Sequence, residues 1–290
     1  MEYVAHIIVV AGIYSILALS LALLVGRAGL LSISHAAFYG VGAYCSALLA
    51  VKLGAPFWGG VLAGAGVAAV LAAVIALSSL RLSGDYFAIA TFGFQMIAFS
   101  VFNNWTELTR GPLGIVGVPR PATFGWPISS VAEFAVLAWA FAALAYVAIR
   151  QLVTSPLSRV LYAIREEEVF AQSLGKRTFE IKVKVFVVSA VFAALAGSLY
   201  AHYVSYVDPT AFTFMESILV LTMVILGGGG SLIGPVVGAV VLVALPEALR
   251  FLGLPTAAAA NLRQIIYGAL LVLMMMARPQ GLVGRYAFGR

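Results

Sequence analysis

The stretch FWGGVLAGAGVAAVLAAVIAL, residues 57–77, contains 21 consecutive residues without a charged side chain. The hydrocarbon core of a bilayer is about 30 Å thick and needs roughly 20 apolar residues for each helical crossing. This stretch therefore predicts one membrane-spanning helix. Runs of similar length and composition recur from Tyr3 to Ala277, so the same pattern decides the fold of nearly the whole chain.

Composition supports this interpretation. Of the 290 residues, 63% are hydrophobic and 10% are charged, whereas soluble domains average about half apolar and a quarter charged. A membrane barrel would alternate polar and apolar residues in segments of about ten, but the runs here are continuous and rich in Ala and Leu. We predict an all-α integral membrane protein: a polytopic bundle of about nine transmembrane helices, within a range of eight to ten.

Nine spans are expected, and they form a single domain over residues 1–290. They lie at residues 4–25, 30–50, 57–77, 86–104, 132–149, 185–203, 213–229, 233–250 and 262–277. The span at 30–50 is interrupted by Ser32, Ser34, His35, Gly40 and Gly42, a pattern typical of discontinuous transporter helices. If that span does not cross, the N-terminus moves to the other side. The Gly- and Pro-rich stretch 105–130 predicts an ordered external loop.

The distribution of Lys and Arg predicts the orientation. Residues 154–184 carry six of the basic residues, so the positive-inside rule places this loop in the cytoplasm. Alternation outward from the loop puts 12 basic residues inside and 5 outside. We therefore expect an external N-terminus and a cytoplasmic C-terminus. Glu2, with no preceding Lys or Arg, is the wrong flank for a cleaved signal peptide, so the first span is expected to be retained.

Several kinds of chemistry find no support in the sequence. The single cysteine, Cys45, excludes an intrachain disulfide, and the three histidines lack the spacing of metal ligands. The run from Gly227 to Pro235 lacks the lysine of a phosphate-binding loop. The net charge of +6 lies mainly at span ends rather than in a patch for nucleic acid. We expect no enzyme, no cofactor, no metal and no nucleic-acid partner.

Buried charge would mark proton or ion coupling. We expect Glu216 to open a span, where a helix N-terminus favours negative charge, and no carboxylate to lie at mid-membrane. Only Glu247, after Pro246, is expected to lie at some depth in the membrane. Because of this residue, a proton-driven carrier stays an alternative function. His35 is either a gate or substrate contact, or a hydrogen-bonded residue at the membrane interface.

Small residues recur at every fourth position and predict close packing of helices rather than a pore lining. One series is Gly60, Gly64, Ala68, Ala72 and Ala76; the other is Gly230, Gly234 and Gly238. In the cytoplasmic loop, residues 158–175 are helical in propensity and end at Gly175, a typical C-cap. Their imperfect apolar face consists of Leu157, Leu161, Ile164, Ala171 and Leu174. An exposed apolar face is unfavourable in water, so either the neighbouring spans or a partner protein must pack against it.

Four segments carry a resemblance to a known family. They are GLLSISHAAFYGVGAY (29–44), SGDYFAIATFG (83–93), NNWTELTRGPLGI (103–115) and a stretch that runs from DP (208–209) through FMES (214–217) to LGGGGSLIGPVVGA (226–239). With the cytoplasmic block through Gly175, they make the chain resemble the LivM-type permease subunits of bacterial branched-chain amino acid ABC importers over most of its length.

The resemblance implies a multi-pass permease of the bacterial inner membrane with no cofactor of its own. It would pair with a second homologous permease of the LivH type, two cytoplasmic ATPases that use ATP, and an external substrate-binding protein. Leucine, isoleucine and valine are the implied cargo. Urea or short amides, carried by relatives, remain an alternative. So do a stand-alone secondary carrier and a scaffold subunit that transports nothing.

The resemblance also implies a cytoplasmic helix, within loop 154–184, that docks on an ATPase. Its candidate coupling residues are Arg159, Ile164, Arg165, Glu166, Glu167, Glu168, Leu174 and Gly175. The candidates for the translocation path or gate are Ser34, His35, Phe38 and Glu247. The external loop 105–130 and the turn at 208–214 are where a binding protein would land.

Overall fold

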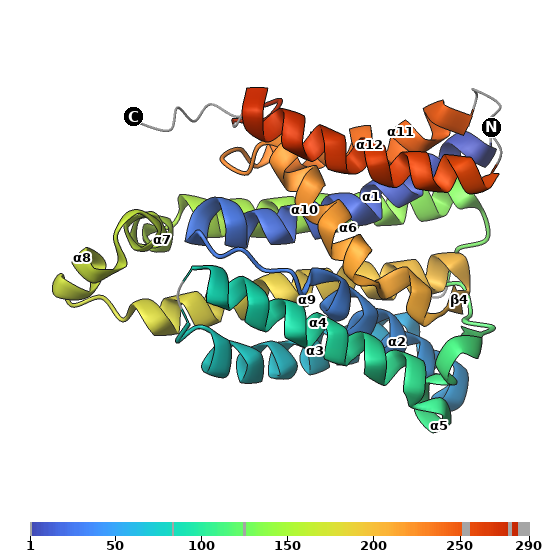
Figure 1. Ribbon diagram of the computed structural model, residues 1–290. Helices are drawn as coiled ribbons and strands as arrows, with labels where there is room; N and C mark the ends of the chain where they lie inside the picture. Colours follow the sequence, from blue (N-terminus) through green and yellow to red (C-terminus); the bar gives the residue numbers. More distant parts are fainter. Residues whose placement is uncertain (1, 83, 124–125, 251–255, 278–279, 284–290) are drawn as a thin grey trace.

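The computed structural model describes residues 2–82, 84–123, 126–250, 256–277 and 280–283, without the side chains of 2, 123, 126–127, 247–250, 256–264, 271 and 275. It is a bundle of long helices (Figure 1). Each expected span falls on one of them: α1 (Glu2–Ala22), α2 (His35–Leu53), α3 (Phe57–Ser79), α4 (Asp85–Asn104), α6 (Val131–Thr154), α9 (Thr178–Val204), α10 (Phe214–Gly227), α11 (Ile233–Arg250) and α12 (Thr256–Ala277).

Among the described residues, six helices are long and apolar enough to cross a membrane: the continuous stretch Tyr3–Ala28 and α2, α3, α4, α6 and α9. The apolar stretches in α10, α11 and α12 are shorter. At about 1.5 Å per residue, the 14 residues of α10 reach only about 21 Å. The chain is thus an all-helical, polytopic membrane protein with these six candidate crossings.

The two ends of the bundle carry different connections (Figure 1). At one end lie α5 (Thr106–Thr109), the 3₁₀ turn η2 (Gly111–Leu113) and the strand β1 (Ile115–Val116), which pairs antiparallel with β4 (Tyr206–Val207). A second short pair joins β2 (Ala122–Thr123) and β3 (Trp126–Pro127). In the described part of the stretch, residues 105–123 and 126–130, these hydrogen-bonded pairs agree with the prediction of an ordered loop. At the other end lie α7 (Pro156–Glu166) and α8 (Glu168–Ser173).

The core is built on very close approach of α2, α3 and α9. A Cβ atom placed on Gly197 would lie 1.9 Å from the carbonyl oxygen of Tyr39, and one on Gly42 would lie 2.0 Å from that of Ala194. Only glycine allows backbones to approach so closely.

The predicted series of small residues on α3 is confirmed. A Cβ atom on Gly60 or Gly64 would touch α2, and Ala68, Ala72 and Ala76 are fully buried. The second series is only partly right. Gly234 and Gly238 pack against α10, but Gly230 precedes α11, so the three residues do not share one helix face.

The break expected in the second span lies before α2, because α2 runs without interruption through Gly40 and Gly42. The last turns of α1 widen into the π-helical stretch η1 (Leu23–Ala28), which ends at Gly29 with φ +67°. Residues 29–34 are not helical, and in Figure 1 the chain doubles back from the end of α1 into the bundle before α2 begins. His35, the first residue of α2, is 1% exposed. The break predicted at Ser32 to His35 is therefore the place inside the protein where α2 begins.

A second helix begins in the same region. The left-handed residue Ser205 (φ +59°) ends α9, and the 3₁₀ turn η3 (Pro209–Phe212) leads the chain back toward α2. Phe212 is fully buried, and its ring packs against those of Tyr39 and Tyr44. Because η3 packs on α2, the following helix α10 begins beside the first turn of α2 rather than at the edge of the bundle.

Candidate translocation and coupling sites

The first backbone N–H groups of α2 find their acceptors on other helices. Ala36 N donates to Ser217 Oγ on α10 at 3.0 Å, and Ala37 N donates to Gln95 Oε1 on α4 at 2.7 Å. Ahead of the helix, Ile33 N donates to Thr91 Oγ1 at 3.1 Å. The first turn of any helix leaves such donors without partners inside the helix, and in a membrane each would cost several kcal/mol unpaired. These side chains are what allow α2 to begin inside the bundle.

Gln95 holds two buried segments together. Its Oε1 accepts from the first turn of α2, and its Nε2 donates to the carbonyl oxygen of Phe212 at 2.8 Å. Ser217 Oγ also donates to Gln95 Oε1 at 3.3 Å. The beginnings of α2 and α10 therefore share one polar network. The sequence analysis did not single out Gln95, Thr91 or Ser217, although a glutamine within an apolar span is the kind of residue that marks such a network.

His35 lies at the centre of the bundle. Its Nε2 is 3.0 Å from Ser20 Oγ on α1 and 3.3 Å from Ser189 Oγ on α9, while its Nδ1 has no partner within the described chain. His35 is therefore a buried, hydrogen-bonded residue inside the bundle, and its role as a gate stays a prediction.

Ser34 and Phe38 belong to the same buried region. Ser34 is fully buried, with its Oγ 3.0 Å from Ser32 Oγ. Phe38, one turn after His35, packs against the rings of Phe94 and Phe186 at centroid distances of 5.4 and 5.7 Å. The structure thus brings together three of the four candidate path residues. Glu247 follows Pro246 on α11, but its side chain lies outside the described residues.

Glu216 corrects the expectation that no carboxylate lies at mid-membrane. It stands in the first turn of α10, and Tyr14 donates its hydroxyl proton to Glu216 Oε1. Tyr14 lies about midway along the continuous helical stretch Tyr3–Ala28. The sequence placed Glu216 correctly at a helix N-terminus, but that terminus lies inside the bundle because η3 turns back from the edge.

The cytoplasmic candidate helix is divided in two. Glu167 adopts an extended conformation (φ −153°, ψ 100°) between α7 and α8, where one continuous helix was expected. Gly175 ends α8 with φ +73°, and its N–H bonds Gln172 O at 2.8 Å, which confirms the predicted C-cap.

The apolar residues of this segment point in two directions. Leu161, Ile164 and Ala171 are almost fully buried, so the protein's own helices cover them. A second set remains open and is more than half exposed: Val169, Phe170 and Leu174. Sequence reasoning selected Leu174 but missed the other two, because it assumed one continuous helix with one apolar face. The exposed set is the part of the segment that is free for a partner protein.

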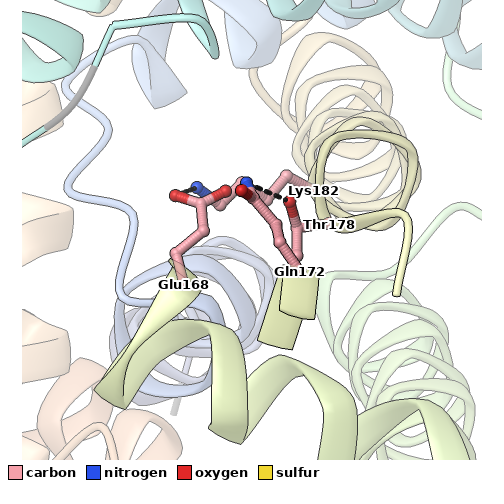
Figure 2. Close-up of polar contacts among 4 residues, drawn as sticks. All are labelled: Glu168, Gln172, Thr178 and Lys182. Atoms are coloured by element: carbon pink, nitrogen blue, oxygen red, sulfur yellow. Dashed lines mark hydrogen bonds and ion pairs between the residues drawn. The ribbon is translucent and has the colours of Figure 1, made fainter. Parts of the chain in front are cut away.

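Two side chains tie this segment to the membrane helices. Arg165 Nη1 donates to the carbonyl oxygen of Gly26 in η1 at 2.6 Å. Figure 2 shows the second tie: Lys182 Nζ on α9 lies 2.5 Å from Glu168 Oε2, next to a hydrogen bond of 3.1 Å from Gln172 Nε2 to Thr178 Oγ1. Arg165 and Glu168 therefore point into the protein, whereas Arg159, Glu166 and Glu167 are exposed.

Helices that begin inside the bundle, held by buried polar side chains, are typical of membrane transport proteins. The chain matches the family model of the branched-chain amino acid transport system permease component over residues 3–275, and it belongs to that family. It is a permease subunit and not an enzyme.

Relatives agree with this assignment. The chain is 37% identical to the high-affinity branched-chain amino acid transport system permease protein LivM of Salmonella typhimurium, covering 93% of this chain and 68% of that protein. It is 36% identical to LivM of Escherichia coli with the same coverage. LivH of Escherichia coli is 26% identical, covering 94% of this chain and 91% of LivH. No solved structure matches the chain.

Proposed function

We propose that this chain is the LivM-type permease of an ABC importer for leucine, isoleucine and valine in the bacterial inner membrane. The observation that carries the proposal is similarity to LivM proteins over 93% of the chain, at 37% and 36% identity against 26% for LivH. A LivH-type permease would then form the other half of the path, with two ATPases and an external binding protein. This chain would bind no cofactor, and its partners would use ATP.

The topology proposed is nine spans in one permease domain over residues 1–290, with the N-terminus outside. The contact between Arg165 and Gly26 supports it, because this contact puts the end of α1 at the same end of the bundle as loop 154–184. In Figure 1 the beginning of α1 lies at the opposite end, near β4. The loop 105–130 and the turn at 208–214 share that end through the pairing of β1 with β4, and form the proposed landing surface for a binding protein.

Coupling would run through Arg165. An ATPase that docks on the exposed side of α7 and α8, at Arg159, Glu166, Glu167 and Leu174, moves Arg165 and with it Gly26 in η1. A Cβ atom on Gly26 would lie 2.0 Å from the carbonyl oxygen of Gly229, so η1 also touches the connection between α10 and α11. π-Helical turns are frequent at functional sites. Here η1 is the joint between the coupling segment and the discontinuous helices.

Downstream of this joint, residues 29–34 lead directly to His35. A shift of η1 would therefore act on the polar network that holds α2 and α10, and the paired N-termini would tilt as small rigid units. Ser34, His35 and Phe38 are the proposed gate. Substrate affinity would lie mainly in the external binding protein.

The test is transport by the reconstituted complex in liposomes. We expect uptake of labelled leucine that requires ATP, the binding protein and the second permease together. Preferential uptake of urea or a short amide would show that the proposed substrate is wrong but that the chain still belongs to an ATP-driven importer. Uptake by this chain alone, driven by a proton gradient, would establish a secondary carrier instead, with Glu216 and Glu247 as the carboxylates to replace first.

A further inference from the structure

Two cavities lie along α6, and they share one residue, Arg159, with the docking surface proposed above. The larger is an open cleft of about 560 Å³ where the end of α6 turns into α7. The smaller is a groove of about 290 Å³ between α6 and α11. Their linings differ in chemistry, and together they match the two parts of a phospholipid.

The cleft is cationic and rich in hydroxyl groups. Its polar lining consists of Arg27, Thr154, Ser155, Ser158, Arg159 and Tyr162, with no carboxylate among the lining residues. Arg159 is exposed and has no ion pair within the described chain. The N-terminus of α7, without a side-chain cap, opens at the same place and adds its positive dipole end. These groups are donors that match the oxygens of a phosphate.

The groove is apolar. It is lined by Trp139, Ala143, Tyr146 and Val147 from α6 and by Ile233 and Val236 from α11, none of which is charged. It therefore suits a hydrocarbon chain rather than a soluble anion. Nearby residues of α6, such as Val136 at 72% and Leu144 at 59% exposure, place this helix at the perimeter of the bundle, where lipid reaches it.

The two cavities adjoin. Positions 139, 146 and 153 of α6 lie seven residues apart, which places them on nearly the same helix face. Tyr146 lines the groove, and Val153, two turns further along, lines the cleft. From the other side, Arg27 in the cleft donates to the carbonyl oxygen of Gly230 at 3.2 Å, three residues before Ile233 of the groove. One molecule can therefore occupy both cavities.

We propose that this paired site binds one anionic phospholipid, with the phosphate between Arg27 and Arg159 and an acyl chain in the groove. The inference needs only the membrane location of the chain, not its transport activity. In the proposed topology the cleft faces the cytoplasmic leaflet, which is rich in anionic lipid, and basic pockets between transmembrane helices bind such headgroups. The lipid would stabilise the junction of α6, α7 and η1.

The experiment counts lipids bound to the full-length chain by native mass spectrometry in neutral detergent. Phosphatidylglycerol is titrated against phosphatidylcholine and against soluble glycerol phosphate. We expect one phosphatidylglycerol to bind preferentially. Arg159→Gln should weaken it about tenfold, the loss of one charge-assisted hydrogen bond, and Ala143→Trp, which fills the groove, should weaken it as well.

The matched control is Arg81→Gln, which removes the same charge from an exposed arginine just after α3 that does not line the cleft. It should leave phosphatidylglycerol binding unchanged. Equal binding of the two lipids, or an equal loss in Arg81→Gln, would show general attraction rather than a site and would overturn the proposal. Binding of glycerol phosphate as tightly as the lipid, unaffected by Ala143→Trp, would make a free phosphate the ligand and the lipid assignment wrong.

Discussion

The beginnings of α2 and α7 are two helix N-termini held in opposite ways. At α2, two N–H groups of the first turn are bonded by side chains from α4 and α10, and His35 is 1% exposed. At α7, no side chain caps the helix, and its first turns line an open cleft. A buried terminus must be satisfied from inside the protein, whereas one at the surface can leave its donors to water or a ligand. The first is therefore held entirely by the protein, whereas the second is open to a ligand or a partner.

The largest loss of stability is expected from a substitution at the contact between α2 and α9. Gly197→Ala would place a Cβ atom 1.9 Å from the carbonyl oxygen of Tyr39, and neither backbone can yield without opening the core. We expect more than about 3 kcal/mol of destabilisation, the upper range of overpacking, measured as loss of folded protein after solubilisation. Gly66→Ala on α3, where a Cβ meets nothing within 4 Å, is the control and should fold normally. Normal yield of the Gly197 variant would show that the two helices are not so closely packed.

The next effect concerns the network at the start of α2. Gln95→Leu would leave the N–H of Ala37 with only the carbonyl oxygen of Ser34 as acceptor and would remove the side-chain donor to the carbonyl of Phe212, at about 1–3 kcal/mol for each buried group. We expect a lower unfolding temperature and loss of uptake, since α2 and α10 would no longer be held together. Asn104→Leu is a matched control, because that amide bonds only Ser100, one turn earlier on the exposed end of α4. If both variants unfold alike, the network does not hold the helix.

These positions show what the sequence could predict. Length and hydropathy located a helix for every expected span, and the serines and His35 marked the break before α2. Hydropathy could not show that α10 also begins inside, because the turn that leads it back depends on Phe212 packing against Tyr39 and Tyr44. Glu216 was therefore placed at the edge instead of beside Tyr14. In each case the missing information was a tertiary contact between residues that lie far apart in the sequence.

The coupling segment was predictable in place but not in detail. The basic loop and Gly175 were identified from composition and helix-capping rules. The break at Glu167, the inward direction of Arg165 and the exposure of Phe170 depend on contacts with η1 and α9, which lie far away in the sequence. The sequence pattern locates such a segment along the chain, but packing against other helices determines which of its side chains are exposed.

A third prediction addresses the tie between α7 and η1. Arg165→Ala removes the bond to Gly26 O without emptying the core, so the protein should fold while leucine uptake falls by about tenfold or more, the loss of a charge-assisted hydrogen bond. ATP hydrolysis by the complex should continue, and this separates lost transmission from lost docking. Arg165→Lys should restore part of the uptake. Arg177→Ala, at an exposed arginine paired with Glu180, is the control and should transport normally. Full uptake by Arg165→Ala would remove Arg165 from the coupling route.

The smallest effect is expected at the second tie, between Lys182 and Glu168. The lysine is 11% exposed but the carboxylate is 36% exposed, so water screens the pair and its coupling energy should stay below about 1 kcal/mol. A double-mutant cycle with Lys182→Met and Glu168→Gln, measured by thermal unfolding, gives this value. The exposed pair Arg177 and Glu180, at 81% and 52%, should give a value nearer zero. A coupling energy of several kcal/mol between Lys182 and Glu168 would mean that α8 is held as firmly as α2, and the contrast between the buried helix and the coupling segment would then fail.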